Sequence, residues 1–365
     1  MITISLCMIV KNEAEVLARC LDSIQHIVDE IIIVDTGSTD ETVEVAKKYT
    51  DKLYFFEWVH DFSKARNYAF SKATCDYMMW LDADDYLKEV DQEKLQKLKK
   101  EFNPEIDVAM LKYNVSFDES GNVTTMNHRE RILKRSKQFQ WMEPVHECIT
   151  PSGHIETFDI AITHGNKNRT HSNRNLEIYE KQTSLTPRGT FYFARELKEH
   201  GRYEEAIDRY ETFLKEGLGW REDNIRACFD LSDCYLNLEE KNKERAVNYL
   251  FQSFLYDLPR AEAYCRIGDY FFQEEAYHQA TYWYGLALYP NAHFKGGFFN
   301  QDYCDYLPNL QLCLTFYRMG NYDLSYKHHL KTKALKPENP SVKYNEAFFK
   351  DFFANKKEDD VTNSM

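Results

Sequence analysis

The stretch Tyr77–Asp85, which reads YMMWLDADD, joins five apolar residues directly to a group of three carboxylates. The apolar part is typical of a β-strand covered on both faces. Like charges packed at a strand end repel one another and raise their own pKa values unless a cation compensates them. Divalent cations prefer oxygen ligands, and Mg²⁺ usually takes one or two carboxylates together with substrate phosphates. We therefore interpret Asp82 and Asp84 as suited to bridge a metal to a diphosphate, against the alternative of an acidic surface turn.

Strand and helix patterns alternate around this stretch, from residue 1 to about residue 165. Alternation of this kind predicts a parallel sheet with right-handed crossovers, in which functional groups collect at the carboxyl ends of the strands. Ser38 is expected to cap a helix, with Glu41 completing a capping box. The expected strands are 2–10, 30–34, 52–57 and 76–81, and the expected helices are 13–24, 38–49 and 62–73.

Two further polar motifs adjoin these elements. Asp35 ends the apolar strand 30–34, and Gly37 follows in a turn where the backbone can approach a ligand. A carboxylate at that point can accept a hydrogen bond from a nucleotide base or a ribose hydroxyl. An ordinary helix N-terminus would explain the polar residues after Asp35 but not Asp35 itself. Arg66, on the helix before YMMW, could clamp a phosphate or could belong to a solvated helix face.

A helix-pair pattern replaces the strands after about residue 185. Small residues recur at Ala206, Ala246, Ala280 and Ser325, at spacings of 40, 34 and 45. The aromatic and glycine residues around them follow the template of the tetratricopeptide repeat. Because the spacing is unequal, insertions are required, and one is expected at 291–302. A generic helical bundle is the alternative.

The composition sets further bounds. A length of 365 residues suggests two domains. The 59 acidic and 46 basic residues give a net charge of −13, which argues against a general nucleic-acid binder. We expect no transmembrane segment, because the N-terminal apolar run is too short, and no secretory signal, because neither a basic n-region nor a cleavage site is evident. Nine cysteines without a C-x-x-C pair are expected to be reduced thiols, so the chain is predicted to be cytoplasmic.

The sequence resembles glycosyltransferase family 2 in four ordered motifs. They read CMIVKNE at 7–13, VDTGSTD at 34–40, ARN at 65–67 and LDADD at 81–85, and together they cover about residues 3–90. The resemblance implies a GT-A fold, a nucleotide-sugar donor that is commonly UDP-linked, and inversion of the anomeric carbon. A looser resemblance, carried by DFSKARN at 61–67 and by the repeats, is to bacterial peptide glycosyltransferases that modify bacteriocins or flagellin.

The family resemblance also implies roles for individual residues. This chain reads DTGS at 35–38 where many relatives read DDGS, and we assign the base-contacting carboxylate to Asp35. The implied roles are as follows: Val10 and Asn12 line the nucleotide pocket, Glu13 and Asp35 hold the base and ribose, Arg66 lies near the nucleotide or its phosphates, Asp82 reaches the ribose or the metal, and Asp84 is the main metal ligand.

An inverting transfer needs a base for the acceptor proton and a positive charge for the leaving UDP. Many relatives carry a VHE motif at this distance after the D-x-D, here 145–147, and Glu147 is our choice of base over Glu143. The alternative is a structural Glu147 paired with a cation. His164 resembles the late histidine that often gives GT-A enzymes a third metal ligand, and beside two carboxylates it suits Mn²⁺. Its alternative is a packed core histidine. The polar run 166–174 is expected to be a mobile loop that orders over the donor.

We therefore expect an α/β, GT-A domain with a Rossmann-like, mostly parallel sheet over 1–170 and a linker or mobile loop over 171–186. Tetratricopeptide-like helices over 187–354 and a disordered tail over 355–365 should follow. The leading hypothesis is an inverting, Mn²⁺- or Mg²⁺-dependent transfer of a hexose or N-acetylhexosamine from a UDP-sugar to a peptide or protein Ser, Thr or Cys. The repeats then hold the acceptor or form a homodimer. The alternatives are the same chemistry on a glycan or cell-envelope acceptor, and a non-catalytic scaffold.

Overall fold

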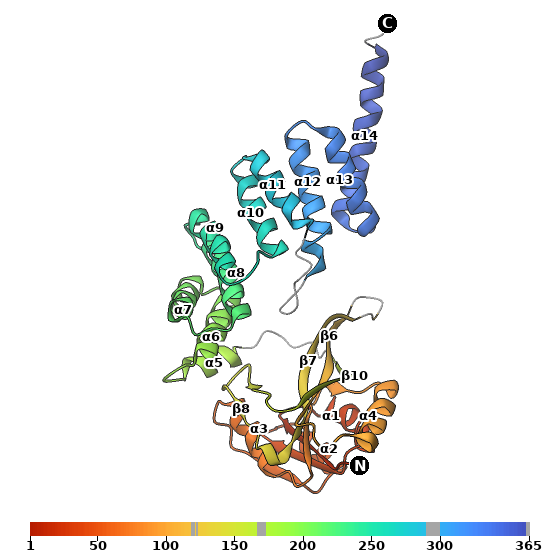
Figure 1. Ribbon diagram of the computed structural model, residues 1–365, viewed down its shortest axis with the longest axis vertical. Helices are drawn as coiled ribbons and strands as arrows, with labels where there is room; N and C mark the ends of the chain where they lie inside the picture. The colour runs from red at the N-terminus through yellow and green to blue at the C-terminus, as the bar shows by residue number, and fades with distance from the viewer. Residues whose placement is uncertain (118–120, 122, 166–172, 290–299, 363–365) are drawn as a thin grey trace. The chain divides into compact units, whose positions relative to one another are not determined.

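The computed structural model describes residues 1–117, 121, 123–165, 173–289 and 300–362. The chain divides into two compact units, Met1–Gly189 and Thr190–Met365, and each is described by itself (Figure 1). The loop predicted at 166–174 and the insertion predicted at 291–302 fall largely outside the described residues. In the part of the chain that is described, none of the helices combines the length with the apolar character that a membrane crossing requires.

A mixed sheet forms the centre of the first unit. Its strands are β1 (Ile4–Val10), β2 (Glu30–Asp35), β3 (Leu53–Phe55), β4 (Tyr77–Trp80), β5 (Asp85–Tyr86), β6 (Val108–Phe117), β7 (Val123–Lys134) and β10 (Ile155–His164). Neighbouring strands follow the order β3-β2-β1-β4-β7-β6-β10-β5. Strands β3, β2, β1 and β4 are parallel to one another, and β10 is parallel to β6, whereas β7 and β5 run antiparallel to their neighbours. The expected α/β domain is confirmed.

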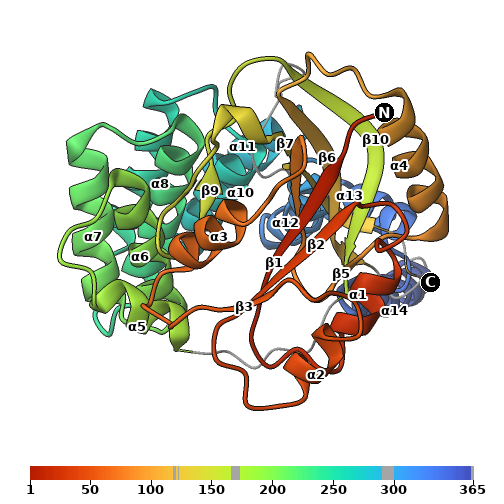
Figure 2. The same ribbon diagram turned by 90° about the horizontal axis from the view of Figure 1, so that it is seen from below.

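Helices pack on both faces of this sheet (Figure 2). They are α1 (Leu17–Asp22), α2 (Thr42–Ala46), α3 (Phe62–Ser71) and α4 (Glu89–Glu101). Helix α5 (Arg174–Glu180) follows β10 along the chain, and a short hairpin of β8 (Trp141–Met142) and β9 (Cys148–Ile149) accompanies α3. Successive side chains of β1 point to opposite faces. Leu6 and Met8 join the apolar cluster that includes α1, α2 and α4, while Cys7 packs with Phe70 of α3 and Trp141 of β8.

The expected cap at Ser38 is wrong. Helix α2 begins only at Thr42, and its N-cap residue is Glu41. The Ser38 hydroxyl instead accepts a hydrogen bond from the backbone N–H of Asn12 at 3.0 Å. Similarly, the Thr42 hydroxyl accepts from the backbone N–H of Glu13 at 2.7 Å. The two hydroxyls therefore accept hydrogen bonds from backbone N–H groups that follow β1. The local capping pattern does not reveal this long-range role.

The second unit consists of helices. They are α6 (Pro187–Glu199, which crosses the division between the units), α7 (Tyr203–Glu216), α8 (Arg221–Asn237), α9 (Lys243–Gln252), α10 (Ala261–Gln273), α11 (Tyr277–Ala287), α12 (Tyr306–Arg318), α13 (Tyr322–Leu335) and α14 (Pro340–Thr362), with short 3₁₀ turns η2 (Ser253–Leu255) and η3 (Gln301–Tyr303). Helices α8 and α9, α10 and α11, and α12 and α13 contact each other as consecutive pairs. The predicted succession of helix pairs is confirmed.

Small residues let the paired helices approach closely. The repeating positions Ala206, Ala246, Ala280 and Ser325 are all buried. A Cβ atom on Gly268 of α10 would lie 2.5 Å from the ring of Tyr284 of α11, so only glycine fits there.

Two segments depart from the expected boundaries. Helix α5 occupies 174–180, inside the segment expected to be a linker, because its apolar side buries Leu176, Ile178 and Tyr179. Helix α14 continues to Thr362, so helical backbone extends into the tail that was expected to be disordered from residue 355.

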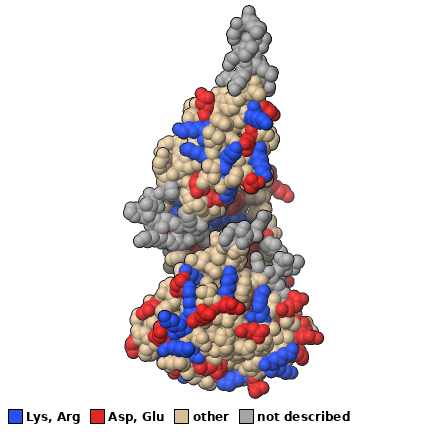
Figure 3. Space-filling view, turned by 90° about the vertical axis from the view of Figure 1, so that its right-hand side faces the viewer, with Lys and Arg blue, Asp and Glu red and all other residues tan. Residues whose placement is uncertain are grey.

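Acidic and basic side chains are interspersed on the face drawn in Figure 3. The surface of the protein also carries exposed ion pairs, such as Lys94 with Asp159 at 2.9 Å and Lys343 with Glu338 at 2.7 Å. Exposed pairs contribute about 0–1 kcal/mol each, so they do little to position a site.

Candidate active site

A cavity of about 280 Å³ lies in the first unit, where the carboxyl ends of β1 and β4 meet. Parallel strands bring their ends to one edge of the sheet, and ligands bind at such edges in open α/β sheets. Seven of the predicted site residues line the cavity: Val10, Glu13, Arg66, Asp82, Asp84, Glu147 and His164. The other two, Asn12 and Asp35, do not line it.

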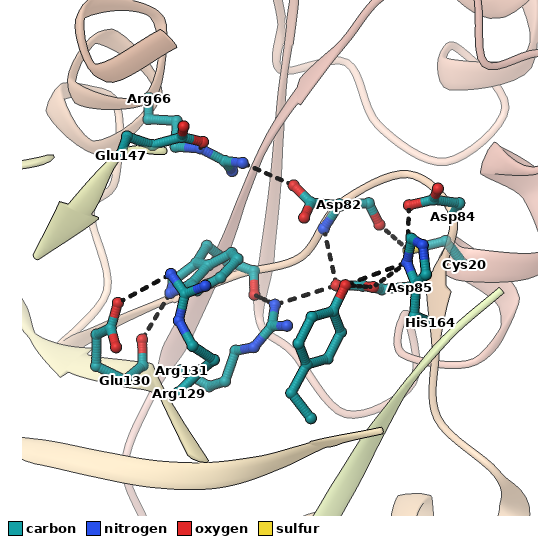
Figure 4. A network of polar contacts seen from close by, with 12 residues as sticks. Cys20, Arg66, Asp82, Asp84, Asp85, Arg129, Glu130, Arg131, Glu147 and His164 are labelled. Atoms are coloured by element: carbon teal, nitrogen blue, oxygen red, sulfur yellow. Dashed lines mark hydrogen bonds and ion pairs between the residues drawn. The ribbon is translucent and has the colours of Figure 1, made fainter. Parts of the chain in front are cut away.

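An acidic cluster with one histidine lies on one side of the cavity (Figure 4). Strand β5 pairs antiparallel with the end of β10 and places His164 opposite Asp85. The Nδ1 atom of His164 lies 3.7 Å from Oδ1 of Asp84 and 3.6 Å from Oδ1 of Asp85. Among the described residues, Asp84, Asp85 and His164 form the group whose ligand atoms lie close enough to share a metal ion. Two carboxylates and an imidazole are a donor set that suits Mn²⁺.

Asp85 is also held from inside the protein. The Tyr113 hydroxyl donates to its Oδ1 at 2.9 Å, and Nη1 of Arg131 donates to its Oδ2 at 3.1 Å. Arg131 and Asp85 are both fully buried, and the guanidinium lies 3.7 Å from the centre of the Trp80 ring. Burial, together with the charge of Asp85, raises the pKa of Tyr113, which keeps its hydroxyl a donor. Hydrogen bonds from Tyr113 and Arg131 therefore fix the position of the Asp85 carboxylate within the protein.

The charge of His164 responds to these neighbours. A hydrogen bond with Asp85 raises the pKa of His164; burial lowers it, and the charge of Asp84 raises it further. A site that draws a proton to its imidazole also draws a cation, because both relieve the same negative charge.

Arg66 is a positively charged residue among the carboxylates that line the cavity. Helix α3 begins at an N-cap, Asp61, whose side chain accepts from the backbone of Lys64, and one turn later it directs Arg66 inward. Nη2 of Arg66 donates to Oδ1 of Asp82 at 2.7 Å, and its Nε donates to Oε1 of Glu147 at 2.7 Å. Burial raises the pKa of Asp82, but Arg66 and Arg131 outweigh it and lower that pKa to about 2.

Asp82 is therefore paired with Arg66, and the cluster that could hold a metal contains Asp85 in its place. Sequence reasoning passed over Asp85 although it adjoins Asp84. Only the pairing of β5 with β10 places Asp85 beside His164.

Glu147 lies on a loop whose backbone forms hydrogen bonds with α3 and α5. Pro144 accepts a hydrogen bond from the first residue of α3, Phe62, at 2.9 Å, and the Tyr179 hydroxyl donates to the carbonyl of Val145 at 3.2 Å. His146 has a left-handed backbone, with φ of +52°, which turns the chain sharply just before Glu147. The loop thus presents Glu147 to the cavity.

Glu143 has a different position. It also has a left-handed backbone, with φ of +73°, and its Oε1 accepts from the Thr186 hydroxyl at 2.6 Å. Glu143 does not line the cavity, whereas Glu147 does. The carboxylate of Glu147 is also paired with a cation, as the structural alternative for this residue supposed.

Of the residues that the sequence assigned to the nucleotide, some line the cavity and others shape the turn after β2. Val10 and Glu13 line the cavity. Asp35 accepts from the backbone N–H groups of Gly37 at 3.0 Å and Ser38 at 3.1 Å, and so shapes the turn after β2. Asn12, with φ of +55°, accepts from the backbone of Thr39 at 2.8 Å and joins the same turn to β1.

Other cavity residues were not predicted from the sequence. They are Ile9, Lys11, Thr36, Phe62, Ala83, Val145, His146, Arg174 and Asn175. Several adjoin a predicted residue in sequence, and that adjacency is the signal that could have found them. Arg174 and Asn175 come from α5. Arg174 ends the run 166–174 that was expected to order over the donor, whereas Asn175 lies in the segment expected to be a linker, and only the fold brings it to the cavity.

Comparison with known proteins assigns the class of the first unit. Residues 5–156 match the model of glycosyl transferase family 2, which confirms the resemblance seen in the four motifs. The match to this family lies within the first unit, and tetratricopeptide-like helix pairs follow it along the chain.

Particular relatives share parts of the chain. A 154-residue region is 36% identical to the TPR repeat-containing protein Synpcc7942_0270 of Synechococcus elongatus, covering 42% of this chain and 36% of that protein. A 233-residue region is 29% identical to the SPbeta prophage-derived glycosyltransferase SunS of Bacillus subtilis, covering 59% of this chain and 53% of SunS. The chain thus spans about a third to a half of these relatives' length. The crystal structure of S. aureus TarS 1-349 in complex with UDP is 16% identical, covers 76% of this chain and 91% of that one, and has a TM-score of 0.36.

Proposed function

We propose that this protein is an inverting, metal-dependent glycosyltransferase that moves a hexose or N-acetylhexosamine from a UDP-sugar to a hydroxyl or thiol of a peptide or protein. One observation carries the proposal: a single cavity is lined by Asp84 and His164, two members of the acidic cluster, together with the carboxylate of Glu147. The match to family 2 and the similarity to SunS, a glycosyltransferase by name, support the same class of reaction.

The acidic cluster is assigned to the diphosphate of the donor. Asp84 and His164 would hold Mn²⁺ or Mg²⁺, with Asp85 beside them. A divalent cation bound there supplies the positive charge that stabilises the departing UDP. Val10 and Glu13 are assigned to the nucleotide, while Asn12 and Asp35 shape the wall behind it.

Glu147 is assigned as the base. The acceptor oxygen or sulfur forms a bond to the anomeric carbon while the bond from that carbon to UDP breaks, which inverts the configuration. The acceptor proton passes to the carboxylate of Glu147. Arg66 donates to that carboxylate and positions it in the cavity. A thiolate acceptor would need this base less than a hydroxyl would.

The helix pairs are the reason for proposing a polypeptide acceptor. Tandem helical repeats build extended binding surfaces, and a second unit in the same chain keeps a bound polypeptide at a raised effective concentration near the catalytic unit. The same chemistry on a glycan is an outcome that the acceptor experiment would detect.

The donor is tested with the full-length chain and a panel of UDP- and GDP-sugars, with Mn²⁺ and with EDTA. Thermal unfolding and nucleotide release are measured. A ligand at one hundred times its Kd adds about 2.7 kcal/mol to the free energy of unfolding, which a melting curve resolves. We expect one UDP-sugar to protect the protein only when Mn²⁺ is present. Absence of protection and of nucleotide release with every donor would refute the activity.

The acceptor is tested with the UDP-sugar found in that panel. Ser-, Thr- and Cys-containing peptides and a soluble oligosaccharide are incubated with it, and products are identified by mass spectrometry. We expect sugar to be attached to a peptide. Transfer to the oligosaccharide alone would overturn the polypeptide part of the proposal and leave the donor chemistry in place.

A further inference from the structure

A second cavity, of about 320 Å³, lies within the helical unit. Helices α8, α9 and α10 and the turn η3 surround it. Its volume is at the lower end of the range of about 300–1,000 Å³ that is typical of ligand pockets, so it suits a side chain or a similarly small group.

Most charged groups around this cavity are already paired with each other. Arg266 donates to Asp233 at 2.5 Å and to Glu262 at 2.7 Å. Lys243 donates to Glu274 at 2.7 Å. Each of these charged groups therefore already has a partner of opposite charge, and Lys198 of α6 is a second cation in contact with Asp233, at 2.6 Å.

Asp269 differs from these groups. It lines the cavity, and among the described residues it forms no ion pair. Its Oδ1 accepts a hydrogen bond from the Tyr284 hydroxyl at 2.7 Å, which fixes the carboxylate between α10 and α11. Burial raises the pKa of Asp269 and outweighs the hydrogen bond from Tyr284 and the charge of Arg266, which both lower it. A further cation entering the cavity would stabilise the ionised carboxylate.

The remaining walls define what kind of cation fits. Leu236, Val247 and Leu250 offer apolar surface, and Tyr270 and Tyr303 offer aromatic rings. An apolar surface accommodates a methylene stem, and aromatic rings attract an ammonium or guanidinium group. A long side chain with a charged end matches both requirements, whereas a bare inorganic cation uses only the carboxylate.

We propose that this cavity binds a Lys or Arg side chain of the polypeptide acceptor, with the charged end paired to Asp269 and the stem along Leu236 and Val247. The inference rests on the proposed function in that it takes the acceptor to be a polypeptide. It also predicts a selectivity for certain acceptors. These acceptors carry a basic residue that the helical unit binds, and this residue is different from the one that receives the sugar.

The test measures binding, with neither a donor nor sugar transfer. The probes are the peptide acetyl-GSGKGSG-amide and a matched peptide with norleucine in place of lysine, which has a similar apolar stem but no charge. Their Kd values for the full-length protein are measured by saturation-transfer NMR. We expect the lysine peptide to bind at least tenfold more tightly than the norleucine peptide, and we expect added salt to reduce the difference.

The variant Asp269→Asn keeps an oxygen that can accept from Tyr284 and removes the charge. Its affinity for the lysine peptide should fall to that of the norleucine peptide. Glu338→Gln is the matched control, since this carboxylate is 86% exposed, pairs with Lys343 and does not line the cavity. Its affinity for the lysine peptide should equal that of the unaltered protein.

Equal affinities of the unaltered protein for the two peptides would overturn the inference, and this comparison needs no variant to fold. Full retention of lysine-peptide binding by Asp269→Asn would also overturn it. If n-butylammonium binds as tightly as the lysine peptide, the site takes free amines and the polypeptide assignment is wrong. Loss of sugar transfer alone would refute the proposed function without changing these Kd values, so the two failures are distinguishable.

Discussion

The Nε atom of Arg66 donates a hydrogen bond to Oε1 of Glu147 over 2.7 Å, although 81 positions separate the two residues in the sequence. The same guanidinium donates to Asp82 and lies 4.7 Å from the centre of the Trp141 ring. One cation on α3 therefore positions two carboxylates that reach the cavity from different parts of the fold.

Removing that cation should destabilise the protein. In Arg66→Gln, Asp82 and Glu147 would face each other in a largely buried space without compensation. Loss of one partner from a buried ion pair costs about 3–5 kcal/mol, and we expect about 3 kcal/mol because Asp82 is partly exposed. Urea unfolding measures the change. Lys64→Gln, an exposed substitution on the same helix, should cost under about 0.5 kcal/mol. Equal costs for the two variants would contradict the central position given to Arg66.

Glu147→Gln should retain donor binding and lose transfer to a hydroxyl acceptor. Proton transfer by a positioned side chain contributes about 10²–10⁴-fold, so the transfer rate should fall by that factor while donor-induced thermal protection persists. Glu143→Gln is the matched control, because Glu143 bonds Thr186 outside the cavity, and its rate should stay within a few fold. An unchanged rate in Glu147→Gln would place the base elsewhere.

Asp84→Asn should abolish the dependence of donor binding on Mn²⁺. The substitution removes one charge from the group of Asp84, Asp85 and His164, so a divalent cation loses its main electrostatic reason to bind. The measurement is thermal protection by the UDP-sugar with Mn²⁺ and with EDTA. Asp51→Asn, in an exposed position before β3, should behave as the unaltered protein does. Undiminished Mn²⁺-dependent protection in Asp84→Asn would exclude this residue as a ligand.

Glu30 should contribute to stability at neutral pH and not in strong acid. Burial raises the pKa of this carboxyl, but hydrogen bonds from Lys52, Ser5 and Thr74 outweigh that effect and lower it to about 2, against an ordinary value of 4.5. The folded state therefore favours the ionised form. Its contribution of about 2 kcal/mol is complete above pH 4.5 and disappears as the pH falls toward 2.

Glu30→Gln should accordingly lower the free energy of unfolding at pH 7 and have a smaller effect near pH 2.5. Urea unfolding across this pH range gives the comparison, and Glu44→Gln, at an exposed position, serves as the control. A loss in Glu30→Gln that does not depend on pH would show that the ionised form has no special role.

Two glycines of one helix pair should respond in opposite directions. In Gly268→Ala the new Cβ would lie 2.5 Å from the Tyr284 ring, so the helices must separate, at a cost of about 1–3 kcal/mol. In Gly285→Ala nothing lies within 4 Å, and alanine should stabilise the helix by up to about 1 kcal/mol. Thermal unfolding of both variants tests the packing of α10 on α11, and destabilisation by Gly285→Ala would contradict it.

Local patterns predict the parts of this fold that depend on local energetics. Strand β4 lies within its apolar run, and the helix pairs lie where small residues such as Ala206 and Ala280 recur, because burial of an apolar face dominates at these positions. The four strands expected before residue 82 are all present and parallel. Strands β6 and β7, which run antiparallel to each other, were not expected individually.

Long-range contacts account for what was missed. Ser38 has the sequence context of a helix cap, yet its hydroxyl bonds to Asn12, 26 positions away. Asp85 looks like the end of an acidic turn, and only its pairing with His164 reveals it as part of a cluster. Chain spacing carries no information on such partners, so the carboxylates of 82–85 were found by sequence while their division between Arg66 and His164 was not.

The pairing of the two-residue strand β5 with the end of β10 has a consequence for biosynthesis. Asp84 and Asp85 leave the ribosome about 80 residues before His164, which corresponds to about 4–16 s at roughly 5–20 residues per second. During that interval the carboxylates lack the imidazole and the backbone of Gly165, whose N–H donates to the carbonyl of Asp84 at 2.9 Å. The nascent chain therefore cannot complete this cluster until nearly the whole first unit has been translated.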